Sequence, residues 1–234
     1  MAFDYSNLSG RPRGAFISLA GRVLPGITRV QDDVVPFAEA WRRDNLAALA
    51  GERPLWVALG DSLTQGIGAP SHDRGWVGLA RDRLSGDGFD LAVLNLGISG
   101  ATTADVLERQ LPVLAELPAE PPVALVTLMV GSNDLMRPNQ RKLLPTRYAE
   151  ILQALPRGSV VTTMPNPSAV ARRANDTLLE VARQRGLVVG ELRDPRTSSW
   201  RGKLAADHFH PNEAGYAAIA DVLAGVLRAA AREV

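Results

Sequence analysis

The sequence contains no cysteine among its 234 residues. This absence excludes disulfide bonds, thiolate nucleophiles and cysteine-ligated metal sites. It also favours a reducing compartment, so we expect a cytoplasmic protein. Only three histidines are present, His72, His208 and His210. Few sets of metal ligands can therefore be built from this chain, and we expect neither a metal ion nor another cofactor.

The sequence also has no large excess of positive or negative charge and no long apolar run. Lys and Arg number 26, Asp and Glu number 25, and the formal net charge is +1. So small a net charge gives no field that would attract nucleic acid or a membrane surface. The apolar stretch AFISLA near the N-terminus is too short for the core of a signal peptide, and no segment approaches a membrane-spanning length. We expect no nucleic-acid partner and no membrane span.

What the sequence does contain is a regular alternation of short apolar strands and amphipathic helices, which is typical of a parallel sheet covered by helices on both faces. The expected strands are residues 54–60, 90–97, 122–131, 159–165 and 187–192. The expected helices are residues 32–50, 76–86, 102–117, 145–156, 168–186 and 211–233, the last with Pro211 at its first position. Residues 51–234 are expected to form a single catalytic domain, with residues 1–50 as an N-terminal arm and helix packed on it.

Chemically reactive side chains gather directly after the expected strands. The segment GDS, residues 60–62, follows the first strand, NLGISG (95–100) the second, and GSND (131–134) the third, while DHFHP (207–211) precedes the last helix. Ligands of such folds bind beyond the carboxyl ends of the strands. We therefore expect these four segments to meet at one edge of the sheet.

The residue types in these segments suit acyl transfer. A serine hydroxyl needs a base to remove its proton, and His210 can act as that base for Ser62. Asp207, three residues earlier, can orient the imidazole. The tetrahedral intermediate needs donors for its oxyanion, and we expect these to be the backbone N–H groups of Ser62 and Gly97 and the side-chain amide of Asn133.

These four segments, in this order, resemble the blocks of the SGNH (GDSL-type) hydrolase family. The resemblance runs from residue 57 to about residue 216. It implies a flavodoxin-like, three-layer αβα sandwich with a five-stranded parallel sheet. The family includes esterases, lipases, thioesterases, arylesterases and sugar acyltransferases, so the resemblance defines the mechanism more closely than the substrate.

Simpler interpretations exist for several of these residues. Ser62 suits a helix N-cap, and Asp61 suits a structural acid at a helix N-terminus. His208 and His210 form an H-x-H pair, but no third ligand is evident, and His72 lies in a polar loop where solvation is the simplest expectation. The segment GISG lacks the full spacing of a dinucleotide-binding loop.

Two polar segments are candidates for substrate choice. Residues 134–147 carry Arg137 and Arg141, and residues 194–203 lead through Trp200 into the Asp207–His210 segment. Solvated loops are the usual interpretation of such segments. The alternative is a cationic rim for an anionic substrate, with Trp200 lining an acyl pocket or anchoring its loop.

Three functions follow from these observations. The first is a serine esterase that forms an acyl-enzyme on Ser62 and hydrolyses it with water. The second is an acyltransferase that moves a short or medium acyl chain, such as octanoyl, from an ester or thioester donor to a sugar or glucosylglycerate-type hydroxyl, as cytoplasmic relatives of this family do. The third, a catalytically inactive binding module, fits poorly with a complete catalytic set. The oligomeric state is not evident from the sequence.

Overall fold

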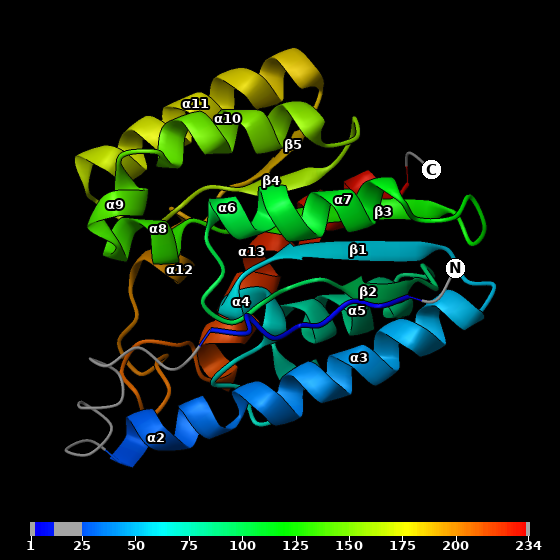
Figure 1. The fold of residues 1–234 in the computed structure, drawn as a ribbon, viewed down its shortest axis with the longest axis horizontal. Helices are drawn as coiled ribbons and strands as arrows, with labels where there is room; N and C mark the ends of the chain where they lie inside the picture. The colour runs from blue at the N-terminus through cyan, green and yellow to red at the C-terminus, as the bar shows by residue number, and fades with distance from the viewer. Residues whose placement is uncertain (1–2, 12–24, 233–234) are drawn as a thin grey trace.

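A computed structural model describes residues 3–11 and 25–232 of the chain. Its centre is a sheet of five parallel strands in the order β2-β1-β3-β4-β5 (Figure 1). The strands are β1 (Leu55–Gly60), β2 (Ala92–Asn95), β3 (Val123–Met129), β4 (Val160–Thr162) and β5 (Val188–Gly190). This strand order is that of the flavodoxin-like doubly wound fold. The expected sandwich architecture and its five-stranded parallel sheet are confirmed.

Side chains alternate across the sheet because successive residues of a strand point to opposite faces. On one face, Leu55, Val57 and Leu59 of β1 pack with α10 (Leu144–Ala154) and α11 (Ala169–Arg185). On the other face, Trp56 and Ala58 pack with α5 (Trp76–Gly86) and α13 (Glu213–Ala231). The two resulting cores lie between the sheet and the helices that form the outer layers of the sandwich, and Trp76 is fully buried in the second core.

The N-terminal part of the chain covers the β2 edge of the sheet. Helix α3 (Val34–Ala50) follows α2 (Pro25–Asp32) and runs beside β2 (Figure 1). Residues 3–11 lie between this helix and the sheet, where the hydroxyl of Tyr5 donates to the carbonyl of Leu96. The division of the chain at residue 50 stays a prediction, and the part of the N-terminal arm at residues 12–24 lies outside the described residues.

Local details differ from expectation at two helices. The helix expected over residues 102–117 is α6 (Thr103–Asp105), a π-helical segment η2 (Val106–Gln110) and α7 (Leu111–Ala115) in succession. It begins with a capping box between Thr102 and Asp105. The last helix begins at Glu213 with Asn212 as its N-cap, so Pro211 lies before the helix rather than at its first position.

Helix α13 corrects one expectation. It has 19 residues and is long and apolar enough to qualify as a membrane span by length and composition, so the statement that no segment approaches that length is wrong. The apolar character has a local explanation, because Tyr216, Ile219, Leu223 and Leu227 are buried in the second core. A helix that packs along a sheet needs an apolar stripe of this kind.

Five short helices in the loops were not expected. They are α4 (Ser62–Gln65), η1 (His72–Arg74), α8 (Ser132–Met136), α9 (Pro138–Arg141) and α12 (Pro195–Ser198). Each has five residues or fewer, so periodicity could not indicate it. Helices α4 and α8 begin immediately beyond the carboxyl ends of β1 and β3, and together with the segment before α13 they build the candidate site.

Candidate active site

Ser62 is the first residue of α4, directly beyond the end of β1. The N-cap of this helix is Asp61, whose Oδ1 accepts a hydrogen bond from the backbone N–H of Leu63 at 3.0 Å. The structural role expected for Asp61 is thus observed, and the capping role considered for Ser62 belongs to its neighbour. As the first helical residue, Ser62 has a backbone N–H with no acceptor inside the helix. Its side chain is left to make contacts outside the helix.

Ser62, His210 and Asp207 form a continuous hydrogen-bonded chain. The Oγ of Ser62 lies 3.0 Å from Nε2 of His210, and Nδ1 of the same ring lies 2.6 Å from Oδ2 of Asp207. The second oxygen of Asp207 accepts from the backbone N–H groups of Phe209 and His210, each at 3.0 Å. A carboxylate at Nδ1 selects the tautomer that leaves Nε2 free to accept the serine proton.

The histidine is held by contacts on several sides. Its carbonyl accepts from the N–H of Ala205 at 2.8 Å, and the ring of Phe209 stands edge-on to it with centroids 4.8 Å apart. Gly68, at φ 95°, allows close approach behind the ring, since a Cβ there would lie 2.9 Å from the Cβ of His210. The imidazole position is therefore set by packing as well as by hydrogen bonds.

Asn133 lies near Ser62 on the neighbouring short helix α8. Its Nδ2 donates to the carbonyl of Ala101 at 2.9 Å and lies 3.5 Å from Oδ2 of Asp61. The following residue, Asp134, is fully buried and accepts hydrogen bonds from the backbone and hydroxyl of Thr103. These bonds tie α8 to the loop after β2, so the amide of Asn133 is held in a defined orientation.

The backbone N–H of Gly97, which we expect to be an oxyanion donor, donates to Oδ1 of Asn95 at 2.8 Å. This N–H is therefore already engaged within its own loop. A Cβ at this residue would meet Asn95, Asp61 and Gln65, which explains the glycine as a packing requirement.

Gly100 is the second glycine of the NLGISG segment. It is the third residue of a turn closed by the hydrogen bond from Ala101 N–H to the carbonyl of Ile98, and it has a φ of 77°, which favours glycine. Its N–H has no acceptor among the described residues. Gly100 also directly precedes Ala101, whose carbonyl contacts Asn133.

A buried network of amide side chains supports this loop from below. Asn7 of the N-terminal arm donates to the carbonyls of Asn95 and Gly97 at 2.9 and 2.8 Å. Asn45 of α3 also donates to the Asn95 carbonyl and accepts from the Asn95 N–H, both at 2.8 Å. Gln65 of α4 joins the arm to the loop, because it donates to the carbonyl of Asn7 and accepts from the N–H of Ser99. Buried networks with satisfied partners of this kind favour a single conformation.

Two buried carboxyl groups lie close to the serine. Burial raises the pKa of Asp61 to about 7, with the N–H of Leu63 acting against the rise and Asp134 adding to it. Burial likewise raises the pKa of Asp134 above its usual range, although hydrogen bonds from Thr103 oppose the shift. Asp207 differs. Burial alone would raise its pKa, but the hydrogen bond from His210 and that ring's charge hold it below its usual value. The carboxyl group of Asp207 is thus kept ionised by its contact with His210.

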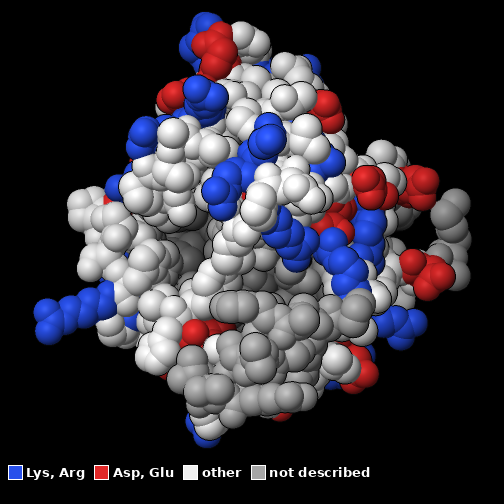
Figure 2. All heavy atoms as spheres, turned by 60° about the vertical axis from the view of Figure 1, so that its left-hand side comes forward, with Lys and Arg blue, Asp and Glu red and all other residues white. Residues whose placement is uncertain are grey.

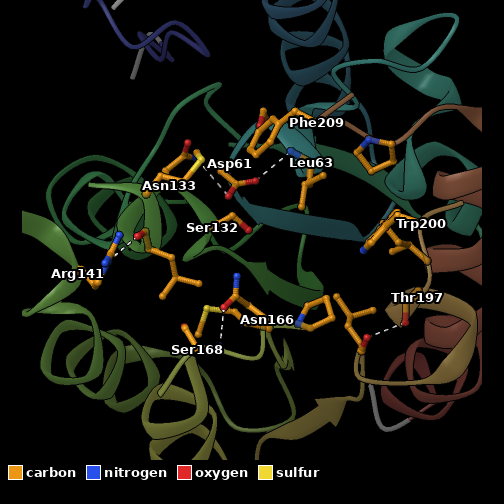
Figure 3. Close-up of a pocket in the computed structure, with 18 residues that line it drawn as sticks. Asp61, Leu63, Ser132, Asn133, Arg141, Asn166, Ser168, Thr197, Trp200 and Phe209 are labelled. Carbon is orange, nitrogen blue, oxygen red and sulfur yellow. Dashed lines mark hydrogen bonds between the residues drawn. The ribbon is translucent and has the colours of Figure 1, made fainter. Parts of the chain in front are cut away.

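A cavity of about 490 Å³ opens over Ser62 and Asn133. Figure 3 shows Arg141 and Trp200 on opposite sides of it. The apolar lining comes from Leu63, Leu135, Met136, Met164, Pro165, Leu192, Trp200, Phe209, Pro211 and Ile219. Of the proposed substrate-binding residues, Trp200 and Arg141 line the cavity. Arg137 is outside that lining, and its Nη2 donates to the carbonyl of Gly100 at 3.2 Å.

The remaining two histidines lie outside the site. His208 is exposed and adopts a left-handed backbone conformation with φ 55°. His72 is not simply solvated, because its Nε2 lies 2.7 Å from Oδ2 of Asp44 and its ring stands edge-on to Trp41. Within residues 3–11 and 25–232, no three His, Asp or Glu side chains are grouped as a metal site.

Comparison with known proteins agrees with this geometry. The sequence pattern of the GDSL-like Lipase/Acylhydrolase family matches residues 58–218. The chain is 41% identical over 81 residues to "Esterase TesA" of Pseudomonas aeruginosa, an alignment that covers 35% of this chain and 38% of that protein. It is 32% identical over 109 residues to "Arylesterase" of Vibrio mimicus, covering 47% and 51% respectively. The chain thus matches about half or less of the length of these relatives.

Solved structures share the fold over a longer stretch. A crystal structure of TesA superposes with a TM-score of 0.57 at 23% identity, covering 75% of this chain and 99% of that one. The salicylyl-acyltransferase SsfX3 from a tetracycline biosynthetic pathway superposes with a TM-score of 0.52 at 18% identity, covering 74% and 53%. At these identities the likeness establishes the fold.

Proposed function

Because the chain belongs to the GDSL-like lipase/acylhydrolase family, we propose that it hydrolyses carboxylic esters through an acyl-enzyme on Ser62. Membership makes it an SGNH serine esterase or acyltransferase. The observation that carries the proposal is the hydrogen-bonded chain from Asp207 through His210 to Ser62. It ends at the lining of a cavity large enough for a small-molecule ester.

In the first half of the reaction, Oγ of Ser62 attacks the ester carbonyl while Nε2 of His210 takes the serine proton. Asp207 stabilises the imidazolium that forms. The carbonyl oxygen becomes an oxyanion, and we assign its donors to the backbone N–H groups of Ser62 and Gly100 and the amide of Asn133. Collapse of the intermediate breaks the bond to the alcohol, which leaves with the proton from His210.

In the second half, water attacks the acyl-enzyme. His210 accepts one proton of the water, and the hydroxide oxygen bonds to the acyl carbon through a second tetrahedral intermediate. When the bond to Ser62 breaks, the proton returns from His210 to the serine oxygen. One ester and one water give one carboxylic acid and one alcohol, and the enzyme is restored.

The oxyanion arrangement also explains the long contact between Asn133 and Asp61. A distance of 3.5 Å is at the limit of a hydrogen bond, so this N–H is available to a better acceptor. We propose that the oxyanion of the intermediate replaces this contact. The second N–H of Asn133 keeps its bond to Ala101, which holds the amide plane in position.

An acyltransferase would use the same acyl-enzyme, with a sugar hydroxyl in place of water. The two functions separate in one assay. The protein is incubated with 4-nitrophenyl esters of increasing acyl length, with and without sugars such as glucosylglycerate, and both nitrophenol and acylated sugar are measured. Fast release without sugar supports the esterase, whereas release that requires sugar and yields acyl-sugar supports the transferase. Equal inertness of wild type and Ser62→Ala on every donor would overturn both.

A further inference from the structure

Positive charge on the cavity rim is unevenly compensated. The segment 134–147 carries Arg137, Arg141, Lys142 and Arg147. Its single acid, Asp134, is fully buried and bonded to Thr103. In the segment 194–203, the single acid Asp194 is paired with Arg196 at 2.8 Å, and Arg201 and Lys203 have no acid of that segment left to pair with. Figure 2, which looks onto this face, shows Lys and Arg side chains gathered beside a hollow. Of the cations in these two segments, Arg141 is the one that lines the cavity.

Arg141 brings that charge into the cavity itself. Its Nε donates to the carbonyl of Leu135 at 2.7 Å, which holds the guanidinium against the wall formed by α8. No carboxylate lies within ion-pair distance of Arg141 in the described part of the chain. Its two terminal nitrogens are therefore left with donors for a ligand.

Asn166 adds a second donor on the same side of the cavity. Its Oδ1 accepts from the backbone N–H of Ser168 at 3.0 Å, which sets the orientation of the amide. The amide nitrogen must then point the opposite way, and Figure 3 shows it directed into the cavity between Arg141 and Trp200. The nitrogen has no acceptor among the described residues.

Apart from these polar groups, much of the cavity lining is apolar. Leu135, Met136 and Met164 line the cavity beside them, and Leu192 and Ile219 line its other part. An apolar chain fits this apolar lining, whereas a group that meets Arg141 and Asn166 must accept hydrogen bonds. A planar guanidinium with free donors is best matched by an oxyanion such as a carboxylate.

We propose that Arg141 and Asn166 form an anion subsite, and that the substrates are esters carrying a carboxylate or a similar oxyanion in addition to the scissile bond. This inference rests on the proposed esterase function, since the subsite lies in the same cavity as Ser62. The anion belongs either to the far end of the acyl chain or to the alcohol part, and the test has one arm for each.

The substrates for the test are two matched pairs. For the acyl chain, mono-4-nitrophenyl suberate is compared with 4-nitrophenyl octanoate, which has the same chain length and no carboxylate. For the alcohol part, 4-carboxyphenyl hexanoate is compared with 4-methylphenyl hexanoate. The value of kcat/KM is measured for each ester with the full chain. We expect the anionic member of one pair to be preferred by about tenfold, which corresponds to about 1.4 kcal/mol.

Three variants decide whether the preference comes from this subsite. Arg141→Met should abolish it by lowering kcat/KM for the preferred anionic ester by about tenfold. Asn166→Leu should reduce the preference for the anionic ester without abolishing it. Lys142→Met is the matched control, because it removes the same charge from the adjacent residue, which is outside the cavity lining. It should keep the preference.

The outcomes distinguish the two proposals. If wild type hydrolyses the neutral esters and shows no preference in either pair, the anion subsite is wrong and the esterase proposal stands. The same conclusion follows if Arg141→Met and Lys142→Met reduce a preference equally, because a general field would then be responsible. If wild type hydrolyses none of the four esters, the esterase proposal itself fails.

Discussion

The Nη2 atom of Arg11 lies 3.3 Å from the carbonyl oxygen of Gly100, the residue whose N–H we assign to the oxyanion. The same guanidinium nitrogen lies 3.0 Å from Oδ2 of Asp105, and Arg137 donates to the same Gly100 carbonyl from the opposite segment. Arg11 belongs to the N-terminal arm, outside the stretch that matches the family. The arm therefore acts as a positioning element for the loop after β2.

Replacing Arg11 with Ala should lower kcat by about fivefold and leave KM nearly unchanged, because the oxyanion forms in the transition state rather than in the bound ester. Arg11→Lys should recover part of the loss. Steady-state kinetics on a 4-nitrophenyl ester give both parameters. The matched control is Arg53→Ala, which breaks an exposed ion pair with Asp90 away from the site. Equal losses in the two Ala variants would show that the arm has no such role.

His210 and His72 form a contrasting pair, since each lies against a carboxylate but only one contacts Ser62. His210→Ala should reduce kcat/KM by at least about 10³-fold, because the serine loses its base. His72→Ala should leave it near wild type, since the bond to Asp44 supports α3 rather than the reaction. Far-UV circular dichroism checks that both variants are folded. The reverse pattern of activities would contradict the assignment of His210 as the base for Ser62.

Asn133→Ala should lower kcat by about 10²- to 10³-fold through the loss of one oxyanion donor. Asn133→Asp is a useful second variant, because it keeps the size but places negative charge beside the developing oxyanion and Asp61. It should be at least as inactive as the Ala variant. Single-turnover measurements of nitrophenol release test the chemical step directly. An Asp variant with wild-type kcat would exclude the amide from the oxyanion site.

The raised pKa of Asp61 has a consequence for stability. Its pKa is about 7 in the folded state against 3.8 as its ordinary value, so between pH 4 and 7 the folded state holds a proton that the unfolded chain lacks. This contribution to the free energy of unfolding is full below pH 4 and is lost as the pH rises through 7. Asp61→Asn removes it. In urea denaturation, the variant should therefore gain stability relative to wild type as the pH rises from 4 to 7.

In the same denaturation experiment, Asp105 should show the opposite dependence of stability on pH, and at lower pH. Burial alone would raise its pKa, but hydrogen bonds from Thr102 and Arg11 lower it below its usual value. Its contribution to stability is present above pH 4 and is lost as the pH falls further. Asp105→Asn should thus be most destabilised relative to wild type at neutral pH. If Asp61→Asn does not gain stability relative to wild type between pH 4 and 7, the burial argument for Asp61 is wrong.

The fold was accessible from the sequence because its strands are short, apolar and regularly separated by amphipathic helices. The same alternation predicted where Ser62, Asn133 and His210 would meet, since carboxyl ends of parallel strands share one edge. The four-residue helix that begins at Ser62 could not be predicted, because one helical turn has no measurable periodicity. The sequence also could not show that the side chain of Asn95 binds the N–H of Gly97, because that contact depends on the folded loop.

The sequence did not predict that the N-terminal arm positions the loop after β2. Asn7 and Arg11 are polar residues in a stretch with little pattern, and polar residues in such stretches are usually solvated. Their partners are backbone carbonyls of Asn95, Gly97 and Gly100, which lie about ninety residues away in the chain. Side-chain bonds to backbone carry no signature in the residue types of their acceptors, so only the folded chain reveals them.

The central claim, that Ser62 carries the acyl group, is tested most directly by intact-protein mass spectrometry. The full chain is mixed with a 4-nitrophenyl ester and quenched in acid within the first turnover, and the modified peptide is then sequenced. We predict a single mass increase equal to the acyl group, located on Ser62 and absent from Ser62→Ala. Nitrophenol release by wild type with no acyl adduct, or with the adduct on another residue, would contradict the account.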